Sequence, residues 1–521
     1  MNELSHAFSA YRSGNLVVAE RICQQLLSVD GALFDAAHLL GVAQWALGKK
    51  DAALASYDRA LALRPDHGEA VFNRSVALYE LKRYEEALAS YDRALALRPD
   101  HAVTFCNRGA VLYALGRFEE ALASYDRALA LQPGYVDALS NRGVALRALR
   151  RFEEALASYD QVFALHPDHV DALSNRGDAL VQLKRIEEAS ASYNRAIALR
   201  PDHAGAHLGN ATLRLLIGDF TRGWPEYEWR WRTAALTPRH FSQPRWSGAQ
   251  DIRGKTILLH SEQAFGDVIQ FCRYVPLVAK RAGRVILEVP GALRGLMRSL
   301  SGDARIVRSG DDLPVFDVRC PLLSLPLAFG TRLETIPSRT PYLRAAPRYL
   351  EKWGALLGPK HRLRIGVSWS GRPTHKNDRI RSIKLASLLP LLDVDATLVS
   401  VQKDVSGEDA KLLMEQKRIV HFGEALEDFS DTAALISHLD LVLSVDTSVA
   451  HLAGALAKPV WVMLPFTPDW RWLLDRNDSP WYPTARLFRQ DDTRAWDNVI
   501  ARVKDELRNF VQGHQSSSIS A

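Results

Sequence analysis

Apolar residues recur every three or four positions from the start of the chain to about Tyr227, and the same arrangement returns with a fixed 34-residue period. In one such unit, Leu78 lies on the apolar face of a first predicted helix, and Ala87, Tyr91 and Leu95 share a face of a second. Ala87 lets the two helices approach, Tyr91 is expected to fill the space between neighbouring units, and Pro99 ends the second helix. The pattern predicts a row of helix pairs, each of which exposes an apolar face until the next pair covers it.

Single residue types keep the same 34-residue step. This period, with glycine, alanine, aromatic and proline residues at these offsets, closely resembles the tetratricopeptide repeat. We count about six and a half repeats between residues 3 and 231 and expect an all-α solenoid over residues 1–232. The residues that carry the period are Pro65, Pro99, Pro133, Pro167 and Pro201, Tyr57, Tyr91, Tyr125, Tyr159 and Tyr193, and Ala53, Ala87, Ala121, Ala155 and Ala189.

Asparagine follows the same period on the first helix of the repeats, the helix that faces the concave side in tetratricopeptide folds. A carboxamide offers one acceptor and two donors, enough to hold the backbone of an extended peptide without reading its side chains. An arginine follows each asparagine and would add a preference for acidic peptides. Alternatively, asparagine is merely tolerated at this offset and the arginines form a solvated face. The candidate peptide-binding residues are Asn73, Asn107, Asn141 and Asn175.

After Gly223 the repeat dissolves into a stretch that is rich in tryptophan and broken by proline. A flexible linker is poor in tryptophan, so we expect the junction at residues 233–254 to pack rigidly against the next domain. Stacking of a sugar on one of these rings is the alternative. The tryptophans of this region are Trp224, Trp229, Trp231 and Trp246.

From Lys255 onward, short apolar strands alternate with helical segments. Such alternation predicts parallel sheets covered by helices, here two doubly wound, Rossmann-like α/β domains at residues 255–350 and 362–511. Ligands bind such domains at the carboxyl ends of the strands. The polar residues 512–521 predict a disordered tail. The predicted strands are 256–260, 285–289, 305–307, 315–318, 364–369, 396–401, 441–445 and 459–464.

The main candidate site is the turn between the strand at 441–445 and the Ala-rich helix that follows it. Asp446, Thr447 and Ser448 occupy this turn, so that backbone N–H groups and two hydroxyls lie at the positive end of a helix dipole. His451 lies one helical turn after Thr447 and faces the same opening. The arrangement favours a bound phosphate or diphosphate, although Asp446 and Ser448 are also ordinary helix caps.

A second candidate follows the first strand of the α/β half, in the segment SEQAFGDVIQF. Gly266 allows a close turn, and Asp267 opens a helix. Functionally, Asp267 would be the general base for an acceptor hydroxyl, with Glu262 as the rival base. Structurally, Asp267 followed by Gln270 fits a capping box, and the spacing alone favours this reading.

Small and basic residues follow the strands at 364–369 and 396–401. The first of these loops carries four lysines or arginines and would clamp a diphosphate opposite the Thr447 helix terminus, unless it is simply solvated. Together with the turn residues, the candidate donor-binding set is Gly266, Ser368, Gly371, Lys376, Gln402, Lys403, Asp446, Thr447, Ser448 and His451.

GDVIQFCRYVP followed by SVDTSVAHLAGALAKP resembles the heptosyltransferase-type glycosyltransferases. Repeats followed by GWPEYEWRW, SEQAFGDVIQF and LPFTPDWRWLLDRNDSPWYP are similar, over nearly the whole chain, to bacterial tetratricopeptide-repeat glycosyltransferases. The resemblance implies a GT-B fold, a nucleotide-diphosphate sugar as donor substrate in the second domain, and neither metal nor cofactor. It makes Asp267 the base and Asp446, Thr447 and His451 the donor signature. Ser448 stands where the pattern has glycine, and the first α/β domain is short for this fold.

Composition is that of an ordinary globular protein. Lys plus Arg number 66 and Asp plus Glu 60, and no basic run predicts binding to nucleic acid or to a membrane surface. The four cysteines are far apart and indicate neither a disulfide framework nor a thiolate zinc site. The first residues lack the apolar core of a signal peptide, and no run of apolar residues is long enough to span a bilayer. We therefore expect a cytoplasmic protein.

These observations favour a metal-independent, inverting glycosyltransferase of GT-B fold whose repeats recruit a protein or glycan acceptor. A related alternative is modification of protein Ser or Thr, as by the O-linked N-acetylglucosamine transferases, which share the solenoid-plus-GT-B plan and an asparagine ladder. An alternative from another class is a binding scaffold with a degenerate transferase fold.

Overall fold

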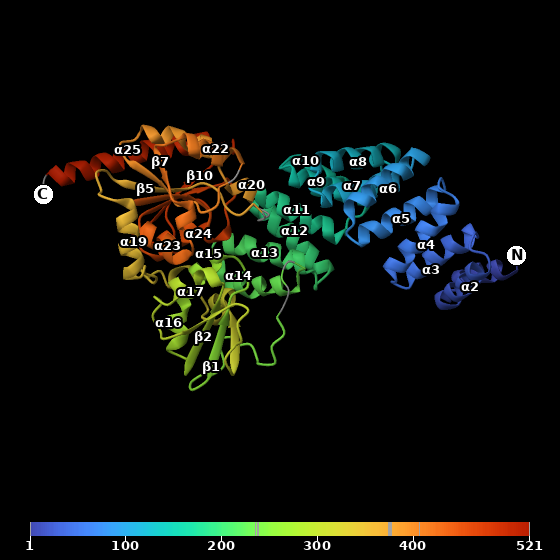
Figure 1. Cartoon of the computed structure of the whole chain (residues 1–521), viewed down its shortest axis with the longest axis horizontal. Coiled ribbons are helices and arrows are strands. Elements are labelled where there is room, and N and C mark those ends of the chain that lie inside the picture. The colour runs from blue at the N-terminus through green and yellow to red at the C-terminus, as the bar shows by residue number, and fades with distance from the viewer. Residues whose placement is uncertain (1, 235, 237–238, 374–377, 406, 520–521) are drawn as a thin grey trace. The chain divides into compact units, whose positions relative to one another are not determined.

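The computed structural model describes residues 2–234, 236, 239–373, 378–405 and 407–519. The chain divides into two compact units, residues 1–203 and 204–521. Over the described residues the first unit is helical, and the second contains helices and two parallel sheets (Figure 1). The predicted fold class, an all-α solenoid followed by α/β domains, is confirmed.

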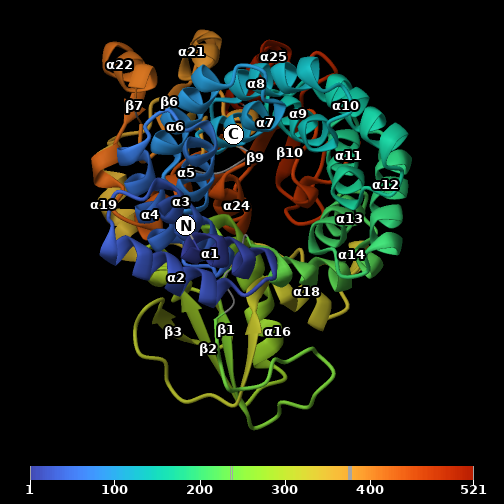
Figure 2. The ribbon, with the colours of Figure 1, turned by 90° about the vertical axis from the view of Figure 1, so that its right-hand side faces the viewer.

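The first unit consists of successive helix pairs that follow one another along a curve (Figure 2). Each pair corresponds to one repeat. A tight turn joins its two helices, and from α4 onward a loop that contains proline leads to the next pair. The helices are α1 (Asn2–Arg12), α2 (Leu16–Val29), α3 (Phe34–Ala46), α4 (Lys50–Leu63), α5 (Gly68–Glu80), α6 (Tyr84–Leu97), α7 (Ala102–Ala114), α8 (Phe118–Leu131), α9 (Val136–Ala148), α10 (Phe152–Leu165), α11 (Val170–Gln182) and α12 (Ile186–Leu199).

The repeated tyrosines pack inside their own repeat. Tyr125 on α8 is 2% exposed, and a Cβ atom added to Gly109 on α7 would lie 2.5 Å from its ring. The same contact joins Gly143 to Tyr159. In these repeats the ring fills the gap that the glycine leaves between the two helices of one pair. Tyr91 also hydrogen-bonds with Asn107 on the first helix of the next repeat, so the tyrosine contacts the neighbouring repeat as well.

The turn within each helix pair requires a left-handed backbone. Gly48 and Gly116 adopt it with φ of 76° and 75°. Lys82 occupies the equivalent position in the repeat between them, with a φ of 60°. For a residue with a side chain, this conformation is less favourable than for glycine by about 1–2 kcal/mol. Lysine offsets part of this cost, because its backbone loses less entropy on folding than that of glycine.

We expect Lys82→Gly to raise the free energy of unfolding by about 0.5–1 kcal/mol, because glycine adopts the left-handed turn without strain. Gly116→Lys is the matched reverse change and is expected to lower it by a similar amount. Urea denaturation followed by circular dichroism measures both. Equal stability of the wild type and both variants would contradict this account of the turn.

Two further helices extend the repeat pattern but belong to the second unit. They are α13 (Ala204–Leu216) and α14 (Phe220–Tyr227), followed by the short helix η1 (Glu228–Arg232). Trp224 on α14 is buried, and its Nε1 donates to the backbone carbonyl of Thr331 at 3.0 Å. Aromatic anchoring of this kind is why the compact unit begins at residue 204, earlier than the end of the predicted solenoid at 232.

The first sheet has the strand order β3-β2-β1-β4, and all its pairings are parallel. The fourth strand begins at Val318, later than the predicted start at 315. On one face, Leu258 and Ile286 pack against Phe241 of the junction. The elements are β1 (Thr256–His260), α15 (Phe265–Phe271), α16 (Val275–Ala279), β2 (Arg284–Val289), α17 (Gly291–Met297), β3 (Arg305–Arg308), β4 (Val318–Pro321) and α18 (Leu325–Ala328).

The second sheet is parallel throughout, with the order β10-β9-β8-β5-β6-β7. The strands β7 and β10, at its two edges, were not predicted. The elements are α19 (Pro347–Leu357), β5 (Arg364–Ser368), α20 (Asp378–Arg381), α21 (Leu385–Leu388), β6 (Thr397–Ser400), α22 (Gly407–Glu415), β7 (Ile419–His421), α23 (Phe429–Ser437), β8 (Leu441–Val445), α24 (Ser448–Ala455), β9 (Val460–Leu464), β10 (Ala485–Arg489) and α25 (Asp497–Ile519).

The last helix, α25, packs Val499, Val503 and Leu507 into the core of the second sheet. It continues to Ile519, so residues 512–519 are helical where a disordered tail was predicted. Across the described parts of the chain, no helix combines the length and the apolar character that crossing a bilayer requires.

Candidate active site

The predicted phosphate turn lies where the second sheet reverses its strand order. From β5 the chain runs outward to β6 and β7, then returns to place β8, β9 and β10 on the other side. Open α/β sheets bind ligands at the carboxyl ends of the two strands that flank such a reversal. Here these strands are β5, which ends at Ser368, and β8, which leads directly into Asp446.

The turn is built as a helix cap. Thr447 is the N-cap of α24, and its Oγ1 accepts a hydrogen bond from the backbone N–H of Val449 at 3.3 Å. Ser444 Oγ lies 3.2 Å from the same oxygen and holds the threonine side chain in place. Ser448 is the first helical residue, so the start of α24 directs its backbone N–H groups toward the loops that follow β5 and β8.

Helix α15 of the first sheet packs directly on α24 of the second. A Cβ atom added to Gly266 would lie 2.9 Å from His451 Cδ2 and 3.7 Å from the Cα of Ser448. Only a glycine allows this approach. The two segments that the sequence singled out are thus neighbours, although they lie far apart along the chain.

Asp267 is buried in this contact and forms an ion pair with Arg471. Its Oδ2 also accepts a hydrogen bond from the backbone N–H of Ala264 at 3.0 Å, which closes the start of α15. The predicted capping partner, Gln270, takes no part in this cap. Asp267 is the third residue of α15, and its side chain reaches back to Ala264, the residue before the helix. One carboxylate therefore forms both the helix cap and the ion pair.

Arg471 is a site residue that sequence reasoning missed. Its guanidinium also binds Asp469 at 2.8 Å and lies 4.2 Å from the centre of the Trp470 ring. Burial alone would lower the pKa of Arg471, but Asp469 and Asp267 raise it, so the side chain stays charged. The alternation of aromatic and charged residues in PDWRW was the only signal in the sequence.

His451 is held as a neutral ring between the two halves of the site. Its Nδ1 lies 3.0 Å from the Tyr482 hydroxyl, and its ring stacks on Trp472 with centroids 5.3 Å apart. Burial and the charge of Arg471 lower its pKa well below the ordinary value. Trp470, Trp472 and Trp481 of this segment are buried, so their rings pack inside the protein and present no exposed face to a sugar.

Asp446 directly follows β8, and its side chain is 14% exposed. Its Oδ1 lies 3.9 Å from His451 Nε2, and its backbone carbonyl accepts a hydrogen bond from Arg381 at 2.8 Å. Burial and the nearby carboxylate of Asp469 raise the pKa of Asp446 to about 6. A group with this pKa can exchange a proton near neutral pH, a property that the sequence did not reveal.

We expect Asp446→Asn to stabilise the fold by about 1–3 kcal/mol at pH 7.5, because each pKa unit corresponds to 1.36 kcal/mol. The pKa of Asp446 is higher in the folded chain than in the unfolded chain. Between about pH 4 and pH 6 the unfolded chain has released this proton and the folded chain still holds it, so the wild type loses stability as the pH rises through this range. Urea unfolding at several pH values measures this difference, which should vanish near pH 4. A pH-independent difference would contradict the assignment.

Two of the remaining predicted donor residues meet at the end of β5. Gln402 accepts a hydrogen bond from Ser368 Oγ at 3.3 Å and donates one to the Ser370 carbonyl at 3.1 Å. The backbone N–H of Gly371 donates to Ser382 Oγ at 3.0 Å. The loop after β5 is therefore tied to the end of β6 by side-chain hydrogen bonds.

The basic residues predicted around this site make different contacts. Lys403 Nζ donates to the backbone carbonyl of Glu427 instead of extending toward the turn. Arg381 is the member of the basic loop that reaches the turn, through its hydrogen bond to the Asp446 carbonyl. Lys376 lies outside the described residues.

Glu262, the alternative candidate base, contacts η1 and the segment after β4. Its Oε1 lies 2.9 Å from Arg230 Nη2 and accepts a hydrogen bond from the Leu323 N–H at 3.2 Å. Burial raises the pKa of Glu262 to about 7, and Arg230 opposes this shift only in part. Its contacts are therefore those of a residue that ties η1 to the first sheet.

The asparagines of the repeats are half-buried and contact the preceding repeat. Asn73 Nδ2 lies 3.1 Å from His38 Nε2, and Asn175 Oδ1 accepts from Arg147 at 2.7 Å. The arginines next to them form ion pairs along the array, as Arg108 does with Asp92 at 2.6 Å. These contacts leave the asparagines partly exposed and engage the arginines in repeat packing.

Candidate metal ligands do not gather anywhere in the part of the chain that the structure describes: no group of three or more His, Cys, Asp or Glu side chains is placed to hold an ion. Positive charge near the α24 terminus comes from Arg381 and Arg471.

Family models match segments in both halves of the chain. Tetratricopeptide repeat models match residues 38–102, 141–204 and 109–149, and the glycosyltransferase family 9 (heptosyltransferase) model matches residues 422–471. The chain combines tetratricopeptide repeats with a heptosyltransferase-type segment. This confirms the resemblance to tetratricopeptide-repeat glycosyltransferases. The matched segment begins just after β7, runs through α24 to Arg471 and contains the predicted donor turn, while Asp267 lies outside it.

The chain is 27% identical over 332 residues to Protein FlbA of Caulobacter vibrioides, a match that covers 58% of this chain and 54% of that protein. The chain thus spans about half the length of this relative. Similar solved structures include YrrB, a TPR protein with an unusual peptide-binding site (24% identity, 35% of this chain and 95% of that chain, TM-score 0.32), and a tetratricopeptide repeat protein from Parabacteroides merdae (20%, 44% and 90%, TM-score 0.39).

Proposed function

We propose that this protein is a glycosyltransferase that moves a sugar from a nucleotide-diphosphate donor to an acceptor hydroxyl without a metal ion. The observation that carries the proposal is the packing of α15 on α24, which brings the Asp267 segment against the Thr447 and Ser448 turn. A base and a diphosphate site at one place are the two parts that such a displacement needs.

In this mechanism the donor diphosphate lies at the start of α24, where Ser448, the Thr447 hydroxyl and Arg381 offset its charge. Ser368 and Gln402 would contact the nucleotide from the ends of β5 and β6. This arrangement is supported by the position of these elements at the reversal of the second sheet.

Asp267 would take the proton from the acceptor hydroxyl. The acceptor oxygen then forms a bond to the anomeric carbon of the sugar while the bond from that carbon to the diphosphate oxygen breaks, which inverts the configuration. The nucleoside diphosphate leaves with the electron pair. The ion pair with Arg471 orients the Asp267 side chain before the acceptor arrives, and Asp446 is the second candidate base because of its raised pKa.

The repeats would present the acceptor. Solenoids of this kind offer a concave surface to extended peptides, and the partly exposed asparagines lie on successive first helices. Loss of co-purifying peptides on mutation of Asn107 and Asn141 would favour a protein acceptor, as in the O-linked N-acetylglucosamine transferases. Donor binding without transfer to any acceptor would favour the scaffold alternative.

The donor site is tested by thermal unfolding of the full chain with UDP, GDP, CDP, ADP and dTDP and with their sugar conjugates. A ligand at about 100 times its Kd contributes about 2.7 kcal/mol, so we expect at least one of them to raise the Tm by a few degrees. Arg381→Gln should weaken this binding about tenfold, whereas Arg379→Gln, an exposed neighbour on α20, should leave it unchanged. The proposal fails if no nucleotide of the panel raises the Tm and no sugar conjugate is consumed by the protein.

A further inference from the structure

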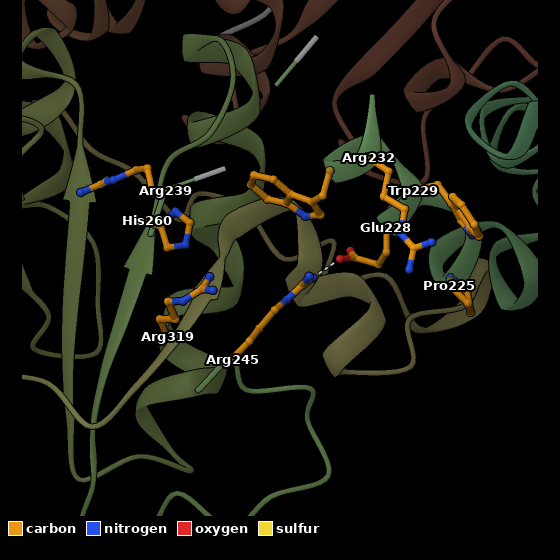
Figure 3. A pocket seen from close by; sticks show the side chains of 9 residues that line it. Pro225, Glu228, Trp229, Arg232, Arg239, Arg245, His260 and Arg319 are labelled. Carbon is orange, nitrogen blue, oxygen red and sulfur yellow. Dashed lines mark hydrogen bonds and ion pairs between the residues drawn. The ribbon is translucent and has the colours of Figure 1, made fainter. Parts of the chain in front are cut away.

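A pocket of about 440 Å³ lies in the first α/β domain, between η1, the junction and the strands β1 and β4 (Figure 3). Its walls include four arginines, the ring of His260 and two tryptophans. The volume is that of a site for a small molecule the size of one or two sugar rings. No residue of the proposed donor site lines it.

The pocket lies at the strand reversal of the first sheet. From β1 the chain proceeds to β2 and β3 on one side and returns to β4 on the other. His260 is the last residue of β1, and the register pairs Leu258 with Arg319 on β4. Because side chains alternate along a strand, Arg319 and His260 project from the same face. This is the position at which open α/β sheets bind ligands.

Positive charge exceeds negative charge around this pocket. Glu228 pairs with Arg230 and Arg245, Glu262 pairs with Arg230, and Glu288 pairs with Arg239. Within the described residues, Arg232 and Arg319 have no ion-pair partner: Arg232 lies against the Trp229 ring and Arg319 against the Phe241 ring. Two cationic groups therefore remain available to an anion.

Buried polar groups in the wall lack partners. His260 is 2% exposed, and neither ring nitrogen has a hydrogen-bond partner among the described residues. The same holds for Trp231 Nε1 and Arg319 Nε. Leaving such groups unsatisfied is costly, so their clustering around one cavity favours an occupant that carries polar groups. Burial, and then the charges of Arg239 and Arg319, lower the pKa of His260 to about 3, so the ring is neutral and offers one donor and one acceptor.

We propose that this pocket binds the carboxylate or phosphate group of a sugar-sized molecule. The arginines would receive the anionic oxygens, since guanidinium groups bind both anions through paired N–H donors. His260 and Trp231 would contact hydroxyl or ring oxygens of the same molecule. The pocket is separate from the donor turn, and its occupancy is measurable without any nucleotide sugar. The proposal is therefore tested independently of the proposed transferase activity.

Isothermal titration calorimetry of the full chain with glucose 6-phosphate, glucuronate and uncharged glucose tests the proposal. We expect at least one of the two anionic sugars to bind and glucose not to bind, and the stronger of the two identifies phosphate or carboxylate as the preferred group. Binding should weaken as salt is raised. Arg319→Gln should reduce the affinity at least tenfold, while Arg305→Gln, an exposed arginine of β3 in the same sheet, should leave it unchanged.

Nitrogen-15 spectra of histidine-labelled protein give a second measurement. The ring signals of His260 should shift on addition of the anionic sugar that binds, and the shift should be lost in the Arg319→Gln variant. If that variant fails to fold, Arg232→Gln at the exposed rim serves the same purpose. Equal binding of glucose and the anionic sugars, binding unaffected by both substitutions, or no binding of either anionic sugar would overturn the proposal.

Discussion

Asp267→Asn is expected to lower kcat/KM for sugar transfer by a factor of about 10² to 10⁴, the range that a positioned general base contributes. Asparagine keeps the shape of the side chain and leaves a carbonyl oxygen facing Arg471, but it cannot take the proton of the acceptor. Arg471 remains paired with Asp469, so the substitution does not leave a buried charge alone. Initial rates of transfer with the donor that the thermal screen selects measure the effect.

Asp446→Asn is the informative companion, because Asp446 is a second carboxyl group at this site and its pKa of about 6 suits proton transfer. If Asp267 is the base, the Asp446 variant should retain a rate within about tenfold of the wild type, and donor affinity should survive in both variants. Full activity of Asp267→Asn with loss of activity in Asp446→Asn would transfer the role of base to Asp446. Thermal melts of each variant separate catalytic effects from loss of folding.

Arg471→Met is expected to lower the free energy of unfolding of the α/β unit by about 3–5 kcal/mol. The substitution leaves the carboxylate of Asp267 buried without its cation, and breaking one side of a buried ion pair has an effect of this size. The guanidinium also fills space against the rings of Trp470 and Phe271, which methionine recovers only in part. Urea unfolding monitored by tryptophan fluorescence measures the loss.

The matched control is Arg476→Met in the same segment. Its partner Asp478 is 69% exposed at the side chain, so this pair contributes about 0–1 kcal/mol. The double variant Asp267→Asn, Arg471→Met should recover part of the stability, because it removes both charges together. A loss no larger for Arg471→Met than for Arg476→Met would show that the ion pair does not hold α15 to the segment after β9.

Both sheets of the α/β unit place polar side chains at their strand reversals, and the two reversals carry different chemistry. At β5 and β8 the site offers a helix terminus, hydroxyls and a buried carboxyl group. At β1 and β4 it offers arginines and a neutral imidazole. A displacement reaction needs two bound molecules, an activated donor and an acceptor. The α/β unit offers one candidate ligand site at each of its two strand reversals.

The sequence alone determined the helix pairs of the first unit, because each depends on residues close in the chain. The 34-residue period places the apolar face, the turn and the proline of every pair within one repeat, so local physics decides them. The central strands were also predictable, since strands buried on both faces are continuous apolar runs. The edge strands β7 and β10 were not, because Ile419–His421 is short and Ala485–Arg489 interleaves apolar residues with arginine.

Only the tertiary structure decided how the candidate residues are used. Asp267 and its partner Arg471 are 204 residues apart, so no spacing rule connects them. The raised pKa of Asp446 comes from burial and from Asp469, and the excess of positive charge around His260 comes from arginines on different segments. Charge and burial act through space, whereas sequence patterns report neighbours along the chain, and for this reason the fold was readable in the sequence and the electrostatics of its sites were not.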